Sequence, residues 1–274
     1  MSGRLARLVA AWLIFAGVGP YLWMTFQAFR DRGDITASPP TLHLALTFQN
    51  FAWEYNGQSI LQLLINGLII SGGTVVLSLI IGAPSAYFFA RFVTPWSRTL
   101  FLLVLSTRMA PPIALSLPMF ALFTFLDIRG SYLSVILAQT AFNVSFVVWF
   151  LQSAVAESPR EIELAAQIDG RSWLGALLDI VIPAHAPALQ AASAFVFLFS
   201  WNEYLLSSLL SSSLTRPITP ALPGFIAQAT SQWGNFCAVA LIASLPPICL
   251  VFMVRRFLAR GFTSGIIHDG TRLA

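Results

Sequence analysis

Residues 60–90 read ILQLLINGLIISGGTVVLSLIIGAPSAYFFA and contain no charged side chain. A helix needs roughly 20 mainly apolar residues to cross the hydrocarbon layer of a bilayer, so this run is long enough for one span. Outward from it, five more stretches qualify, at residues 5–29, 99–125, 132–154, 187–210 and 236–258. The sequence therefore predicts an all-α, polytopic membrane protein with six transmembrane helices in one domain, residues 1–274.

Composition agrees with a membrane environment. Hydrophobic residues make up 57% of the chain and charged residues 9%, whereas about a quarter of the residues of a typical soluble domain are charged. All 15 basic residues are Arg, and Lys is absent. A phosphate-binding P-loop and a Schiff-base site both need Lys. The chain therefore cannot hydrolyse ATP by a Walker mechanism, and we predict no catalytic residue and no cofactor in it.

The thiols and imidazoles indicate no metal site. Cys237 and Cys249 lie in one apolar run, which is more typical of packing residues than of a metal pair. The three His residues are scattered and form no HExxH motif. The sequence pI of about 9.6 does not indicate nucleic acid, because the Arg residues stand between apolar runs as topology determinants do.

The positive charges predict an orientation, because cytoplasmic loops carry an excess of Arg and Lys. With both termini in the cytoplasm, ten Arg residues fall inside, four fall outside and Arg108 lies within a span. The ten are Arg4, Arg7, Arg91, Arg98, Arg160, Arg171, Arg255, Arg256, Arg260 and Arg272. We therefore predict a multi-pass protein with both termini in the cytoplasm.

The segment at residues 157–185, between the fourth and fifth spans, is predicted to lie in the cytoplasm. It holds five of the chain's eleven acidic residues. Ser158, Pro159 and Glu161 are typical of a helix start with Pro at the first helical position, and Gly170 is typical of a helix end. We expect a helix of about three turns. These residues alone fit a docking helix and a plain solvated loop equally well.

The same segment resembles a known motif. Residues 163–170, ELAAQIDG, with Ile182-Pro183 after them, resemble the EAA loop of ABC importer permeases. Together with weaker matches such as AYFFAR at 86–91 and WNEY at 201–204, the layout is similar to the maltose-type carbohydrate permeases, particularly their second subunit. The resemblance covers nearly the whole chain and implies a coupling helix that fits a cleft on a separate ATPase. Its residues here are Glu163, Ala165, Ala166, Asp169 and Gly170.

One position departs from the family pattern. The usual Glu directly precedes the Ala pair, where this chain has Leu164. Glu163 stands one residue earlier, which rotates it by about 100° around a helix. Either Glu163 reaches the ATPase from the side, or docking relies on the close fit of Ala165, Ala166 and Gly170. We favour the second, because small residues permit close backbone approach.

Polar residues within the spans are candidates for the translocation pathway, since ionisable groups at membrane depth usually face an interior or a cavity. Arg108 lies in the third span and Glu203 in the fifth, with Asn143 in the fourth. Trp201 is a candidate to stack on a sugar ring, and Asn202 and Glu203 to accept hydrogen bonds from hydroxyls. A structural alternative is preferred, in which Arg108 pairs with Glu203 or bonds helix carbonyls near Pro111-Pro112. An Arg108 without an ionic partner would favour an anionic solute.

The resemblance implies a permease subunit that carries a sugar or sugar-like solute across the bacterial inner membrane. The implied partners are a second permease subunit, an ATPase dimer that binds ATP and Mg, an extracytoplasmic solute-binding protein and membrane lipid, with no nucleic acid. The family's contact with the binding protein falls on residues 211–235, which composition equally describes as a connector. A secondary transporter and a membrane-embedded enzyme are the alternatives. The first needs intramembrane acids, of which Glu203 is the deep one, and the second needs a nucleophile–base or metal constellation.

Overall fold

The computed structural model describes residues 3–35, 46–52, 54–55, 57–227 and 233–267. The chain forms two compact units. Unit 1 comprises Met1–Asn66 and Arg216–Leu245, and unit 2 comprises Gly67–Thr215 and Pro246–Ala274. Two long helices, α3 (Ile60–Arg91) and α13 (Trp233–Ile267), contribute residues to both.

Unit 1 joins helices through a short β-hairpin and a buried amide. Its other elements are α1 (Gly3–Ala28), α2 (Arg32–Ile35), η1 (Gln49–Phe51), β1 (Glu54–Tyr55), β2 (Gln58–Ser59) and α12 (Ile218–Ala227). Strands β1 and β2 pair antiparallel, with Tyr55 opposite Gln58. Gly57, between them, has φ +76°, a conformation that favours glycine.

Asn50 fixes the end of α1 and the start of α13 within unit 1. Its buried Nδ2 donates to the carbonyls of Ala28 at 3.0 Å and Arg30 at 2.7 Å. Asn235 Nδ2 donates to the carbonyl of Asn50 at 3.2 Å. A Cβ at Gly234 would lie 2.6 Å from Asn50 Nδ2, so this approach requires glycine. Hydrogen bonds therefore hold together chain segments that are far apart in the sequence, beside the apolar cluster of Ala28, Cys237 and Ala238.

Unit 2 contains the remaining elements and the larger core. They are α4 (Pro95–Ser106), α5 (Pro112–Phe125), α6 (Tyr132–Ala156), α7 (Glu161–Ile168), α8 (Trp173–Ala176), η2 (Leu177–Val181), α9 (Ile182–Ala184), α10 (Ala186–Trp201) and α11 (Leu205–Leu210). Helix α6 packs along α10, and Val147 and Val196 are fully buried there. Gly82 of α3 allows the closest approach, because a Cβ there would lie 2.5 Å from Val147 Cγ1.

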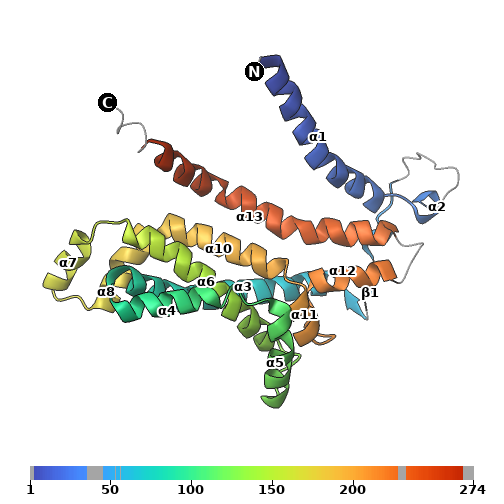
Figure 1. Ribbon diagram of the computed structural model, residues 1–274. Helices are drawn as coiled ribbons and strands as arrows, with labels where there is room; N and C mark the ends of the chain where they lie inside the picture. The colour runs from blue at the N-terminus through green and yellow to red at the C-terminus, as the bar shows by residue number, and fades with distance from the viewer. Residues whose placement is uncertain (1–2, 36–45, 53, 56, 228–232, 268–274) are drawn as a thin grey trace. The chain divides into compact units, whose positions relative to one another are not determined.

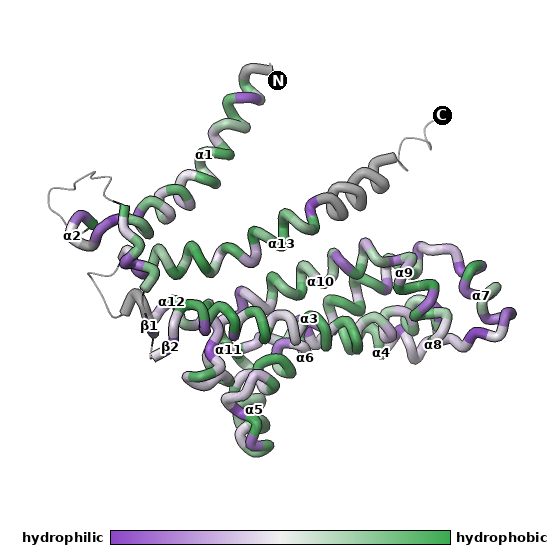
Figure 2. The backbone as a smooth tube through the Cα atoms, turned by 180° about the vertical axis from the view of Figure 1, so that it is seen from behind, coloured by the Kyte–Doolittle hydropathy of each residue, from purple (hydrophilic) through white to green (hydrophobic). Residues whose placement is uncertain are grey.

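The all-α, polytopic class is confirmed. Four helices are long and apolar enough to span a membrane: Leu5–Ala28, Ile60–Arg91, Tyr132–Ala156 and Trp233–Arg255. A fifth candidate is the bent pair formed by Trp173–Ala184 and Ala186–Trp201, whose axes differ by 81°. Figure 2 shows that α4 and α10 are mostly hydrophobic, while hydrophilic residues gather around α7. The hydrophilic residues around α7 therefore distinguish this end of unit 2 from its apolar helices.

The third predicted span is not one continuous helix. Helix α4 ends at Ser106 and α5 begins at Pro112. Pro111 and Pro112 lack the backbone N–H groups that would continue the α4 ladder, and a proline ring also disfavours helical geometry in the residue before it. In Figure 1, α5 leaves the layer formed by α4, α6 and α10. The expected span at 99–125 is therefore broken at 107–111, where Arg108 lies.

The fifth predicted span is also interrupted. Helix α10 ends at Trp201, and the short α11 begins only at Leu205. The intervening residues hold Asn202 and Glu203, whose side chains bond backbone groups of the two helices. The residues of the predicted span at 187–210 therefore form two helices, because local side-chain hydrogen bonds end one helix and start the next.

Candidate functional site

Helix α7 lies at one end of unit 2 and is shorter than predicted (Figure 1). It comprises the eight residues Glu161–Ile168, with Arg160 at the N-cap. The predicted start at Pro159 is two residues too early, because Ser158 is engaged elsewhere: its Oγ accepts from Arg91 Nη2 at 2.8 Å. The predicted end is confirmed, since Gly170 has φ +87°.

A buried ion pair ties α7 to the end of α3. Arg91 Nε donates to Glu163 Oε1 at 3.1 Å and to Oε2 at 3.0 Å, and Nη2 lies 2.5 Å from Oε1. Nη2 also reaches the carbonyl oxygen of Ser158 at 3.3 Å. The two side chains are 6% and 5% exposed. Arg91 therefore holds both ends of the turn that precedes α7.

The pair turns Glu163 inward and leaves the opposite side of α7 uncovered. Ile168 is 86% exposed and Ile162 is 62% exposed, and Leu164 and Ala165 are exposed beside them. Asp169 and Gly170 are also exposed at the end of the helix. An eight-residue helix with apolar residues in water on one face is typical of a surface that another protein covers.

The segment after Gly170 returns to α3. Ser172 Oγ accepts from Gly175 N at 3.1 Å and begins α8. The ring of Trp173 stacks on Tyr87 of α3, with the planes 8° apart and the centroids 6.4 Å apart. Tyr87 and Leu177 are buried in the same cluster. The start of α7 and the segment that follows it are therefore both anchored to α3.

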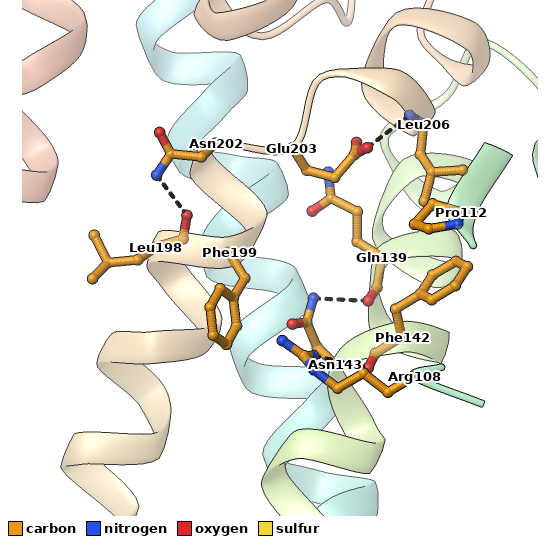
Figure 3. Close-up of a pocket in the computed structure, with 10 residues that line it drawn as sticks. All are labelled: Arg108, Pro112, Gln139, Phe142, Asn143, Leu198, Phe199, Asn202, Glu203 and Leu206. Atoms are coloured by element: carbon orange, nitrogen blue, oxygen red, sulfur yellow. Dashed lines mark hydrogen bonds between the residues drawn. The ribbon is translucent and has the colours of Figure 1, made fainter. Parts of the chain in front are cut away.

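Four of the five predicted pathway residues meet at one cavity of about 510 Å³ in unit 2 (Figure 3). Its polar lining comprises Arg108, Gln139, Asn143, Asn202 and Glu203. Phe142, Phe199 and Leu206 supply apolar wall. In Figure 3, Glu203 lies near the top of the cavity and Arg108 lies near the bottom, beside Asn143. The interruptions of the third and fifth spans therefore open onto the same space.

The Glu203 carboxylate accepts hydrogen bonds from the backbone of α11. Its Oε1 accepts from Leu206 N at 2.9 Å, and its Oε2 accepts from Ser207 N at 2.9 Å and from Ser207 Oγ at 3.2 Å. This carboxylate caps the start of α11, where a negative charge is favoured by the helix dipole. The predicted Arg108–Glu203 pair is not formed.

Arg108 lies against aromatic rings. Its Cζ is 4.6 Å from the centroid of Phe199 and 5.4 Å from that of Phe146. Nη1 lies 3.4 Å from the carbonyl oxygen of Phe142, at the long limit for a hydrogen bond. This carbonyl belongs to α6, whereas the sequence favoured carbonyls near Pro111-Pro112. Among the described residues, no carboxylate pairs with Arg108.

Gln139 is a polar residue of this region that sequence reasoning missed. Its Oε1 accepts from Thr74 Oγ1 at 3.3 Å and from Ser200 Oγ, and its Nε2 donates to Ser207 Oγ at 2.9 Å. The side chain is 1% exposed and joins α3, α6, α10 and α11. Its place one turn before Asn143, on a long helix without charged residues, was the available sequence signal.

Trp201 does not line the cavity. Its side chain is 4% exposed, and its ring stacks on Phe197 with the centroids 5.5 Å apart. The two residues are one helical turn apart on α10, so they share a face of that helix. The expected stacking of Trp201 on a solute therefore finds no support in its position, which is that of a packing residue.

The chain matches known proteins over most of its length. Residues 78–263 match the family model of the "binding-protein-dependent transport system inner membrane component". The probable ABC transporter permease protein y4oR of Sinorhizobium fredii is 31% identical, with 93% of this chain and 92% of that protein covered. The trehalose transport system permease protein SugB of Mycobacterium tuberculosis is 29% identical, with 90% and 91% covered.

A solved structure shares the fold. A bacterial ABC transporter involved in the import of the acidic polysaccharide alginate contains a chain that superposes with a TM-score of 0.74 at 17% identity. The likeness covers 93% of this chain and 95% of that one. This chain therefore belongs to the family of ABC importer permeases, the inner-membrane components of binding-protein-dependent transport systems.

Proposed function

We propose that this permease forms half of a translocation pathway for a sugar or sugar-like solute and is driven through α7. As a member of its family the chain is a transport subunit without catalysis of its own, and ATP is bound by a separate ATPase. The finer proposal is a six-span topology with both termini in the cytoplasm. It also includes a second permease subunit, an ATPase dimer and an extracytoplasmic solute-binding protein as partners.

The observation that carries the proposal is the buried Arg91–Glu163 pair beneath a helix whose other side exposes apolar residues. Because the pair is inaccessible, Glu163 is not offered to an ATPase. The exposed Ala165, Asp169 and Gly170, with the half-buried Ala166 beside them, support docking by close fit. A force applied to α7 reaches α3 directly through the ion pair, and α3 is one of the long apolar helices.

A saccharide suits the cavity. Its volume of about 510 Å³ lies within the usual range for small-molecule sites. Asn143, Asn202 and Phe199 offer amide groups for hydroxyls and an aromatic face for a sugar ring. Among the relatives, SugB is described as a trehalose transport permease, which supports a sugar as solute.

A cross-linking experiment tests the docking surface. With Ala165→Cys in the assembled transporter, we expect a disulfide or bifunctional cross-link to the ATPase, whereas Thr107→Cys in the broken third span should give none. Both side chains are exposed, so reactivity alone does not distinguish them. Cross-linking of Thr107→Cys but not of Ala165→Cys would place the ATPase at another surface and contradict docking through α7.

The energy source is tested in proteoliposomes with the solute-binding protein present. We expect uptake to need internal ATP and to stop with vanadate. Uptake that continues with vanadate and follows a proton or sodium gradient would instead establish a secondary transporter.

A further inference from the structure

The cavity holds a cation without a counter-ion. The ion pairs Arg91–Glu163 and Arg171–Asp179 do not include Arg108, and no carboxylate among the described residues pairs with it. Glu203, the acidic residue of the cavity lining, has both carboxylate oxygens on the backbone of α11. A charged side chain at membrane depth is costly and persists where it faces a cavity or pairs with a partner. No carboxylate among the described residues neutralises Arg108, so an anion that enters the cavity would be its counter-ion.

The aromatic rings around Arg108 orient its guanidinium but accept no hydrogen bond from the N–H groups at its edge. Phe199 and Phe146 lie against the guanidinium at 4.6 Å and 5.4 Å from Cζ. A cation–π contact uses the flat face of the guanidinium, and its N–H groups remain at the edge. Of these groups, Nη1 makes the 3.4 Å contact with the Phe142 carbonyl. The edge that includes Nε and Nη2 carries two N–H donors side by side. This arrangement binds a carboxylate or a similar oxyanion in bidentate fashion.

Two amides complete the donor and acceptor pattern. Asn143 Nδ2 donates to the carbonyl of Gln139 at 2.9 Å, and Asn202 Nδ2 donates to the carbonyl of Leu198 at 2.8 Å (Figure 3). In each amide one N–H of Nδ2 bonds its own helix, and Oδ1 accepts no hydrogen bond from the described residues, so it can accept one from a ligand. The cavity therefore presents a cationic fork and amide oxygens, which together fit a ligand with an oxyanion and hydroxyl groups.

We propose that the solute is an acidic saccharide, with a carboxylate or a sulfonate, and that Arg108 binds its oxyanion during passage. This inference rests on the proposed saccharide pathway and specifies its substrate class. Phe199 has a double role in it, because the ring that holds Arg108 also lines the wall. A neutral sugar of the same size leaves the guanidinium unpaired in the cavity, so the site discriminates against it.

The test uses the complete transporter in proteoliposomes with its solute-binding protein. The probes are a glucuronate-containing disaccharide, a 6-sulfonated glucoside and neutral glucosides of matched size. Binding to the solute-binding protein is measured by calorimetry, and uptake is measured as vanadate-sensitive accumulation. We expect an oxyanion-bearing probe to bind and enter at least 10-fold better than its neutral counterpart, and the two acidic probes show which oxyanion is preferred.

Variants connect this selectivity to Arg108. Arg108→Gln should lower uptake of the acidic probe by 10- to 100-fold while the ATPase remains bound. Arg129→Gln is the matched control, because Arg129 also lies over a ring, 4.3 Å from the centroid of Phe120, but does not line the cavity. If Arg108→Gln does not assemble, Arg108→Lys keeps the charge without the fork and should raise the KM for the acidic probe at least 5-fold.

The outcomes separate the two proposals. If the solute-binding protein and the transporter take neutral saccharides and reject acidic ones, the acidic class is wrong and the saccharide pathway stands. Wild-type uptake of an acidic probe by both Arg108 variants overturns the role of Arg108. If no saccharide probe is bound, or uptake is insensitive to vanadate, the proposed function itself fails.

Discussion

Removal of the Glu163 carboxylate should free α7 from α3. In Glu163→Ala, the Arg91 guanidinium loses three contacts, at 2.5, 3.0 and 3.1 Å, and keeps those to Ser158. Both charges are almost completely buried, and removal of one member of such a pair costs about 3–5 kcal/mol. Isolated helices shorter than about 12 residues are marginal in water, so α7 has little stability of its own to replace this contact.

The lower figure of about 3 kcal/mol corresponds to roughly a 100-fold change in a local opening equilibrium. We therefore expect backbone amides at residues 161–168 to exchange hydrogen about 100-fold faster, or at the unprotected rate, in Glu163→Ala. The measurement is hydrogen exchange with mass spectrometry on the permease pair in nanodiscs without ATPase. The backbone amides of α6 and α10 should keep their wild-type protection, because the change is local to α7.

Glu161→Ala is the control, since Glu161 is exposed on the same helix and should change exchange only slightly. A double variant, Arg91→Met with Glu163→Leu, leaves neither charge buried alone and should restore most of the protection. In the assembled transporter, Glu163→Ala should retain ATP hydrolysis but lose uptake, because the force on α7 no longer reaches α3. Equal exchange in Glu163→Ala and Glu161→Ala would refute the reasoning.

Three further outcomes follow from the packing. Ala165→Trp should reduce co-purification of the ATPase at least 10-fold on affinity chromatography with unchanged membrane insertion, because a large ring interrupts a close-fitting face. Gly170→Ala should destabilise the end of α7 by about 1 kcal/mol, measured by exchange of residues 165–171, because φ +87° disfavours a side chain although no atom lies within 4 Å. Gly82→Ala should lower the thermal midpoint of the purified permease through a cost of about 1–3 kcal/mol, whereas Gly72→Ala should not, because a Cβ meets Val147 in the first case and open space in the second.

Much of the site was predictable from residue type and position. The costly polar groups in apolar runs, Arg108, Asn143, Asn202 and Glu203, do converge on one cavity. Their roles there were not predictable. A carboxylate can accept hydrogen bonds from backbone N–H groups or pair with a guanidinium, and only the distance to each partner decides which interaction forms. Glu203 lies next to the start of α11, so local capping prevails over the pair with Arg108. Gln139 was missed because its three partners come from different helices.

The sequence by itself determined the membrane class, the loop between the fourth and fifth spans, and the end of α7 at Gly170. Each follows from local chemistry: apolar length, charge density, and the conformational freedom of glycine. The tertiary structure decided where the broken helices meet, that Trp201 packs against Phe197, and that Glu163 faces Arg91 of α3. The physical reason is that in a uniformly apolar chain hydrophobicity sets which segments enter the bilayer. Partner choice among those segments depends on long-range hydrogen bonds, ion pairs and shape, which no local pattern records.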